Sequence, residues 1–213
     1  MKYYLFVGLL IIGSTAYGQN MPSGEMQNNK FQLGFFYSTD QNLSGDQVKI
    51  DEYMGYETEY DQYNFLAGLT TTYSWRTQWA LRSGLTYADR SFTGTFYCHV
   101  CDFITSPQPQ SFDLAFVQVP IAIRYYPYRK RVSLFGELGI LNQLMVKEPV
   151  ISRLEANTYS LSSLIAAGIA YNISQQFSAQ LSVQYSNGWS KLFKETDYSY
   201  QILGIELSLL KHF

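Results

Sequence analysis

The segment FSAQLSVQYS, residues 177–186, alternates apolar and polar side chains without interruption. Successive side chains of a β-strand point to opposite faces, so this segment predicts a strand with one apolar and one polar face. A soluble barrel or sandwich turns its apolar face inward, whereas a membrane barrel turns it outward to lipid. Which face forms the interior therefore decides the class of protein.

The first residues predict export from the cytoplasm. Lys2 gives a positive start, the apolar run YYLFVGLLIIG follows, and STAYGQ supplies small residues at Ala16 and Gly18. This is the pattern of a cleaved signal peptide, residues 1–18. A helix that spans a bilayer needs about 20 apolar residues, more than this run holds. We expect a short periplasmic segment at 19–29 and one domain at 30–213.

Composition narrows the class further. Aromatic residues make up 17% of the chain and charged residues 15%, and the charged share is below the roughly 25% of a soluble domain. The net charge of −2 gives no basic footprint for nucleic acid. The mean hydropathy of −0.13 fits a membrane barrel as well as a soluble protein, because half of each barrel strand is polar.

Eight strand-like runs follow one another, and the connections between them alternate in length. The runs are Lys30–Thr39, Tyr63–Trp75, Gln78–Tyr97, Phe112–Tyr126, Val132–Lys147, Tyr159–Tyr171, Gln176–Trp189 and Tyr198–Phe213. The connections at 76–77, 127–131 and 172–175 are short, and longer loops lie between them. This regularity predicts an all-β fold, an eight-stranded antiparallel up-and-down transmembrane β-barrel. Its short turns and both termini would be periplasmic and its longer loops extracellular.

The two faces of the predicted strands differ in kind. One face is apolar, and its charges, Asp89 and Lys211, fall near strand ends. The other face holds small and polar residues and six glycines, with four charged residues among them: Arg82, Arg124, Glu137 and Glu206. A soluble barrel would bury little apolar area on that second face, whereas small side chains and balanced charges suit the narrow lumen of an eight-stranded barrel. The apolar face is therefore predicted to contact lipid.

The four inward charges have two interpretations. An isolated buried charge is costly, so paired charges would form a salt-bridged plug. The alternative is a gate whose pairs rearrange to pass ions.

Aromatic residues are predicted to form two girdles at the membrane interfaces. Trp75, Trp79, Tyr125, Tyr171, Phe177 and Phe213 would lie at the turn end, and Tyr37, Tyr63, Tyr87, Phe112, Tyr185, Trp189 and Tyr198 towards the loops.

Three segments carry a resemblance to a known family. FQLGFFYS in the first run, FVQVPIAIRYYPY in the fourth and LGIELSLLKHF at the end resemble the PorT-like outer-membrane β-barrels of Gram-negative Bacteroidota. More distantly, the chain resembles small barrels of the OmpA and OmpX type. The resemblance implies outer-membrane location and recognition of Phe213, the terminal aromatic residue, by the barrel-assembly machinery. It also implies, for some members, association with secretion proteins.

A C-x-x-C motif lies in the predicted second loop, FYCHVCDF. Cys98 and Cys101 would form a short-range disulfide in an oxidising compartment. Two thiolates and His99 would also resemble half of a metal site, but a closed zinc site needs four ligands and no second cluster is visible. A third interpretation is that the two cysteines are free thiols. We expect no bound metal and no cofactor.

The first long loop, Asp40–Gln62, is acidic, with Lys49 as its single basic residue. Its carboxylates could hold Ca²⁺, but the fixed spacing of an EF-hand is missing. The simpler interpretation of this segment is a solvated acidic loop. The more specific hypothesis is a contact surface for a partner, because interleaved tyrosines favour protein contacts. The residues of that candidate surface are Asp51, Glu52, Tyr53, Tyr56, Glu57 and Glu59.

Catalysis is not predicted. The histidines outside the signal peptide are His99 and His212, and His212 lies at the predicted periplasmic end. Ser106, Ser111 and Asp102 surround His99 in sequence, but no spacing supports a catalytic triad.

The leading hypothesis is a non-enzymatic outer-membrane barrel. It would act as an anchor or interaction subunit whose loops or rim bind another envelope or secretion-system protein. The alternatives are a small or gated channel and a soluble secreted sandwich. The expected partners are outer-membrane lipids, the barrel-assembly machinery during biogenesis and such an envelope protein; nucleic acid is excluded.

Overall fold

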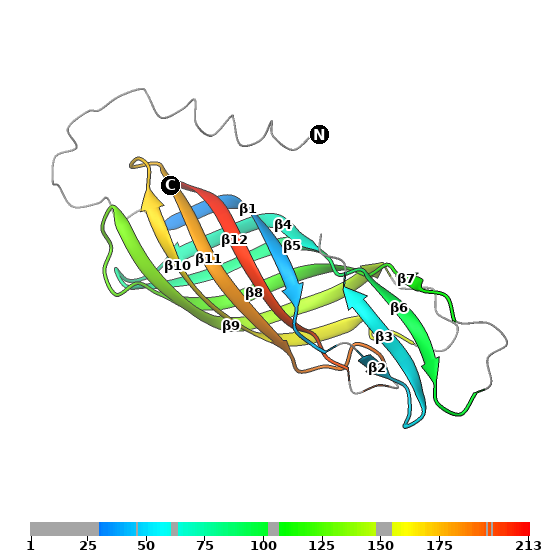
Figure 1. Cartoon of the computed structure of the whole chain (residues 1–213). Helices are drawn as coiled ribbons and strands as arrows, with labels where there is room; N and C mark the ends of the chain where they lie inside the picture. Colours follow the sequence, from blue (N-terminus) through cyan, green and yellow to red (C-terminus); the bar gives the residue numbers. More distant parts are fainter. Residues whose placement is uncertain are drawn as a thin grey trace, which may run out of the picture.

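Eight long antiparallel strands close into a barrel in the computed structural model, which describes residues 30–45, 47–60, 64–101, 107–147, 155–194, 196 and 198–213 (Figure 1). The barrel strands are β1 (Phe31–Asn42), β4 (Phe65–Ser74), β5 (Trp79–Asp89), β8 (Ala115–Tyr125), β9 (Val132–Lys147), β10 (Tyr159–Asn172), β11 (Phe177–Gly188) and β12 (Gln201–His212). Each barrel strand pairs with the barrel strand before it and the one after it in the sequence. The first of them, β1, closes the ring by pairing with both β4 and β12. The predicted eight-stranded up-and-down barrel is confirmed.

The predicted signal peptide, 1–18, and the segment 19–29 lie outside the described residues. Within the described residues, no helix has the length and apolar character that a transmembrane helix requires.

Side-chain parity separates the outside of the barrel from its lumen. Leu207 of β12 and Leu138 of β9 are 53% and 64% exposed, whereas Glu206 and Glu137, their neighbours in sequence, are 2% and 4% exposed. On the other barrel strands too, most of the side chains that point outward are apolar. Such an outer surface is stable only in lipid, because exposed apolar area of this extent is unfavourable in water.

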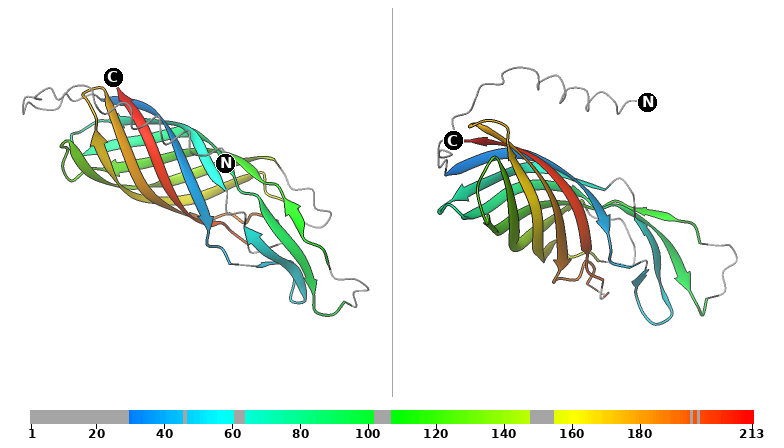
Figure 2. Two further views of the ribbon diagram at one scale, coloured as in Figure 1. Left: turned by 45° about the horizontal axis from the view of Figure 1, so that its top comes forward. Right: turned by 60° about the vertical axis from the view of Figure 1, so that its left-hand side comes forward.

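A second, smaller sheet continues from the loop end of the barrel. It has the strand order β2-β3-β6-β7, with β2 (Gln47–Lys49), β3 (Met54–Tyr60), β6 (Phe92–Cys98) and β7 (Gln110–Phe112). Figure 2 shows this sheet, hereafter the loop-end sheet, at the end of the barrel opposite the C-terminus. The loop predicted at Asp40–Gln62 is therefore not irregular throughout, because its middle forms the β2–β3 hairpin.

The prediction of one continuous strand over Gln78–Tyr97 is wrong in length. It ends at Asp89, and the chain resumes as β6 at Phe92 in the other sheet. The Asp89 carboxylate accepts hydrogen bonds from the Ser91 backbone N–H (3.1 Å) and hydroxyl (2.7 Å). The Arg90 N–H donates to the Leu114 carbonyl at 2.9 Å. These local bonds turn the chain out of the barrel wall between the two strands.

An apolar cluster joins the loop-end sheet to the barrel. It contains Val48, Tyr56, Phe92 and Phe112 from the small sheet together with Phe116, Phe193, Tyr198 and Tyr200. Phe112 and Tyr198, predicted in the lipid-facing girdle, are 1% and 7% exposed and belong to this cluster instead. Tyr63 lies outside the described residues. The predicted turn-end girdle has all six of its aromatic side chains exposed.

We expect a charge on the lipid-facing surface to be costly in proportion to its depth. Leu207 lies midway along β12 and is 53% exposed. The substitution Leu207→Lys should lower the free energy of unfolding in lipid vesicles by about 2–4 kcal/mol. Gln201→Lys, at the loop end of the same strand, is the control and should cost about 0–1 kcal/mol. Urea unfolding monitored by tryptophan fluorescence measures both, and equal costs would contradict the depth assignment.

Candidate functional site

Four charged side chains from four strands meet in the lumen. Arg82 of β5 pairs with Glu137 of β9 at 3.1 Å and with Glu206 of β12 at 2.7 Å. Arg124 of β8 pairs with Glu137 at 2.8 Å. All four side chains are at most 3% exposed. The residues predicted to face the lumen thus form one connected network of two arginines and two glutamates, hereafter the lumen ion network, whose formal charges balance.

Neighbouring residues complete the hydrogen bonding of the two guanidinium groups. Arg82 Nε donates to the Thr70 hydroxyl at 3.1 Å, and Arg124 Nη1 donates to Gln180 Oε1 at 2.7 Å. The Arg124 guanidinium also lies 4.1 Å from the centroid of the Phe135 ring. These partners were not predicted, although the alternation of each strand indicates that their side chains face inward. Buried charges are tolerated only with such complete pairing.

A second buried ion pair lies nearer the loop end. Arg90, just after β5, pairs with Asp40 of β1, and both side chains are at most 4% exposed. Ser38 donates from its hydroxyl to Asp40 Oδ1 at 3.2 Å. This pair was not predicted, because the sequence pattern puts Asp40 in a loop and Arg90 inside a continuous strand.

Apolar side chains fill the lumen on both sides of these charges. Towards the turn end, Tyr126 and Phe135 pack with Ala80 and Ala170. At the loop end, the large cluster around Phe193 and Tyr200 packs against the open end of the barrel. Apolar packing thus lies on both sides of the lumen ion network.

A small cavity lies between the lumen ion network and the apolar cluster at the loop end. Arg82, Arg90, Gln118 and Pro120 are among its lining residues, and the volume open to the centres of water molecules is about 20 Å³. This is room for one or two waters. Beside it, the β5–β8 pairing is interrupted between Ser83↔Ile121 and Thr86↔Gln118. The cause is Pro120, which has no N–H to donate to the ladder.

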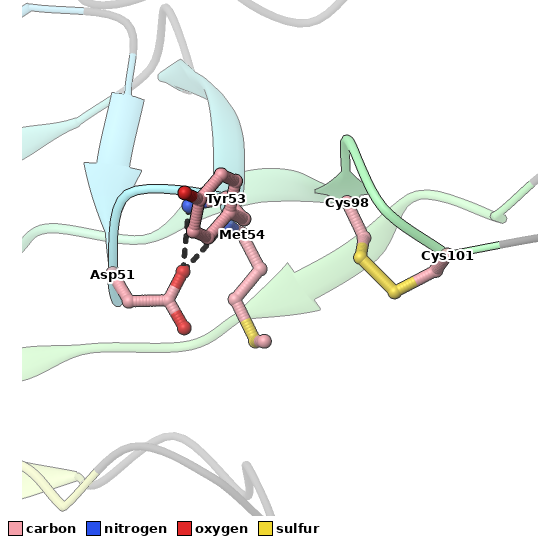
Figure 3. Close-up of a disulfide and its surroundings, with 5 residues drawn as sticks. All are labelled: Asp51, Tyr53, Met54, Cys98 and Cys101. Atoms are coloured by element: carbon pink, nitrogen blue, oxygen red, sulfur yellow. Dashed lines mark hydrogen bonds between the residues drawn. A yellow bond between two sulfur atoms is a disulfide. The ribbon is translucent and has the colours of Figure 1, made fainter.

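A disulfide and a turn shape the tip of the loop-end sheet, where the β2–β3 turn meets the end of β6 (Figure 3). Cys98 and Cys101 are joined, with their Cα atoms 5.4 Å apart. The Asp51 carboxylate accepts hydrogen bonds from the Tyr53 and Met54 backbone N–H groups at 2.7 and 2.8 Å. The His99 N–H, inside the disulfide loop, donates to the Tyr53 carbonyl at 2.8 Å. The two segments of the tip are thus held to each other by backbone contacts.

The side chains of the tip divide into buried and exposed sets. Tyr56, predicted as a contact residue, is 5% exposed and packs edge-on against Phe96 and Phe112. It supports the sheet and does not offer contact area, so that part of the prediction is wrong. Asp51, Glu52, Tyr53, Glu57 and Glu59 are exposed. Val100, which the sequence analysis did not single out, is 69% exposed beside the disulfide.

The other residues considered in the sequence, Phe213, His212 and His99, are not part of a cluster of functional side chains in the described part of the chain. The terminal Phe213 is exposed, and its backbone N–H donates to the Phe31 carbonyl at 2.9 Å. Recognition of Phe213 by the barrel-assembly machinery stays a prediction. His212 contacts the Ser178 hydroxyl at 2.9 Å, while His99 lies at the tip, where its backbone N–H donates to the Tyr53 carbonyl. In the described part of the chain, no three His, Cys, Asp or Glu side chains come together as a metal site would require.

Breaking the lumen ion network should destabilise the barrel strongly. Glu137→Gln removes the carboxylate shared by Arg82 and Arg124 and leaves buried positive charge without compensation, which costs about 3–5 kcal/mol. The control Glu155→Gln removes the exposed partner of Lys194 and should change the unfolding free energy little. Urea titration in lipid vesicles measures both. An unchanged midpoint for Glu137→Gln would show that the network does not stabilise the barrel.

The disulfide should control the local order of the tip and not the stability of the barrel. Its loop is short, so the double variant Cys98→Ser/Cys101→Ser loses about 2 kcal/mol of constraint on opening the tip. Hydrogen exchange at the His99 amide should accelerate about tenfold or more, while the urea midpoint of the barrel stays unchanged. Unchanged exchange at His99 would contradict this role.

Comparison with known proteins places the fold. No family model matches the chain, and no curated protein matches it. Among solved structures, OprG of Pseudomonas aeruginosa matches with a TM-score of 0.58 at 14% identity, over 89% of this chain and 99% of that one. The outer membrane protein AlkL, solved in lipid bilayers, matches with 0.54 at 10% identity, over 92% and 97%. Neisserial surface protein A matches with 0.52 at 8% identity, over 86% and 97%. The chain therefore has the fold of small outer-membrane β-barrels, and its resemblance to the PorT-like family stays a prediction.

Proposed function

We propose that this protein is a non-enzymatic outer-membrane anchor whose loop-end sheet binds another protein of the cell envelope. The observation that carries the proposal is the tip of that sheet. It is held by a disulfide, by the Asp51 turn and by the His99–Tyr53 backbone bond, and it projects beyond the barrel. A PorT-like role beside a secretion protein is the specific form that the sequence resemblance favours.

Outer-membrane location is supported by three independent features. The sequence predicts a signal peptide, the outer surface of the barrel is apolar between two aromatic girdles, and the fold is that of solved outer-membrane barrels. Closed barrels satisfy every backbone polar group inside the sheet, which is what a lipid environment demands.

The tip has the physical character of a protein-binding surface. Tyr53 is 52% exposed and Val100 69% exposed, and the exposed acidic residues Asp51 and Glu52 directly precede Tyr53. Aromatic residues are enriched in interfaces, and a surface that is already ordered loses little conformational entropy on binding. The exposed carboxylates of Glu52, Glu57 and Glu59 favour a partner with a basic surface.

A filled lumen supports an anchor in preference to an open pore. The lumen ion network links β5, β8, β9 and β12 across the interior, and apolar layers lie on both sides of it. The cavity beside Arg82 favours a second candidate, a gated channel, because a void next to a salt bridge gives its side chains room to move. Opening such a channel would require Arg82 to separate from Glu206.

Affinity capture from native outer membranes in mild detergent tests the proposal. With a tag placed after Gln19, the wild-type chain should recover one envelope protein in stoichiometric amount, measured by mass spectrometry. The variant Tyr53→Ala/Val100→Ser should reduce that recovery about tenfold or more, as expected for central interface residues. Trp189→Phe, at an exposed aromatic elsewhere at the loop end, is the control. Absence of a stoichiometric partner, or equal recovery with the tip variant, would contradict the proposal.

A further inference from the structure

Exposed charge is segregated between the two ends of the barrel. In the described residues of the turn end, 30–34, 72–82, 122–136, 170–180 and 208–213, there is no Asp or Glu. Beyond the lumen ion network, the same segments carry six Lys and Arg side chains: Lys30, Arg76, Arg129, Lys130, Arg131 and Lys211. Arg129 is half-buried at the lumen mouth, and the other five are exposed. The exposed acidic side chains of the described chain lie at the loop end. The six cations are hereafter the basic rim.

The basic rim lies at the level of the aromatic girdle. Arg131 donates from Nη2 to the Tyr171 hydroxyl at 2.9 Å, and its guanidinium lies over the Tyr171 ring. Lys211 Nζ lies 5.1 Å from the centroid of the Phe213 ring. Arg76 follows Trp75 directly in sequence. Because girdle aromatics lie at the headgroups of the bilayer, these cations lie where lipid phosphates lie.

The turn that carries three of these cations is held in place. The Lys130 N–H donates to the Ser133 hydroxyl, which donates back to the Lys130 carbonyl, both at 3.0 Å. The Asn172 side chain and backbone N–H groups bond to the carbonyls of Lys130 and Arg131 at 2.9 and 2.8 Å. Arg129 donates to the Ser74 hydroxyl at 3.0 Å and lies over the Tyr126 ring. The backbone of the turn is therefore fixed against β10, and the side chains of Arg129 and Arg131 are held by their own contacts.

We propose that the basic rim binds the phosphate groups of anionic phospholipids in the leaflet that surrounds the turn end. Each Lys or Arg near an anionic membrane surface contributes about a fivefold increase in affinity, and the terminal charges of long side chains reach headgroups while their stems stay in the apolar belt. The acidic loop end would repel the same lipids, so the barrel would gather them on one side only. The inference rests on the barrel fold and not on the proposed partner of the loop-end sheet.

Bromolipid quenching of tryptophan fluorescence tests the proposal in vesicles of phosphatidylcholine with about one fifth phosphatidylglycerol. The bromine label is placed on one lipid species at a time. The three tryptophans are Trp75 and Trp79 at the turn end and Trp189 at the loop end. In a Trp189→Phe background, brominated phosphatidylglycerol should quench as if it were enriched about fivefold or more around the turn end. The enrichment should fall as salt is raised, because ions screen exposed charges.

Neutralising the basic rim should abolish the enrichment. The variant Arg76→Gln/Lys130→Gln/Arg131→Gln/Lys211→Gln should show equal quenching by the two labelled lipids. The matched control, Lys191→Gln/Lys194→Gln at the loop end, should keep the preference of the parent. The reverse reporter, Trp75→Phe/Trp79→Phe, retains Trp189 and should show no enrichment. Heat-modifiable migration on a gel checks that each variant is folded, and Lys130→Gln/Lys211→Gln serves if the fourfold variant is not.

Two results would overturn the proposal. Equal quenching of the turn-end tryptophans by both labelled lipids would show that the basic rim does not select anionic lipid, and an acidic soluble protein would become its expected ligand. Enrichment that persists in the folded rim variants would show that other residues hold the lipid.

Discussion

Closure of the hydrogen-bonded ring at β1 is the constraint on which the rest of the structure depends. β1 pairs with β12 along one edge and with β4 along the other, so no barrel strand has a free edge. In lipid, an unpaired backbone group costs several kcal/mol, and only a closed ring avoids that cost along its whole length. The interruption beside Pro120 is local, and it opens towards the small cavity in the lumen. Once the ring is closed, each side chain faces either lipid or lumen.

The narrow lumen then requires a polar filling that is internally satisfied. Arg82 and Arg124 share Glu137, and Glu206 completes the set, so that charge is balanced within one layer. This layer ties together strands that are far apart in sequence, and the apolar cluster above it joins the barrel to the loop-end sheet. The sheet is thus an extension of a stiff base, and its tip carries Tyr53 and Val100 in a fixed position.

Strand parity was readable from sequence because it is a local property. Alternation alone puts Leu207 towards lipid and Glu206 inside, and the same holds for Arg82 and Arg124. Contacts that join distant segments were not readable. Tyr56 is buried because Phe96 and Phe112 pack on it, and Arg90 is buried because Asp40 faces it. The pairing of β3 with β6 in the loop-end sheet joins residues more than 30 positions apart, and no local pattern encodes its register.

The central claim is that the lumen ion network and the apolar side chains around it close the lumen. Single-channel recording of the purified wild-type barrel in planar lipid bilayers tests this claim most directly. We expect a stable insertion, verified by heat-modifiable migration, with no stepwise current at moderate voltage. A steady, ion-selective open current from the wild-type protein would contradict it and would make the gated channel the better description.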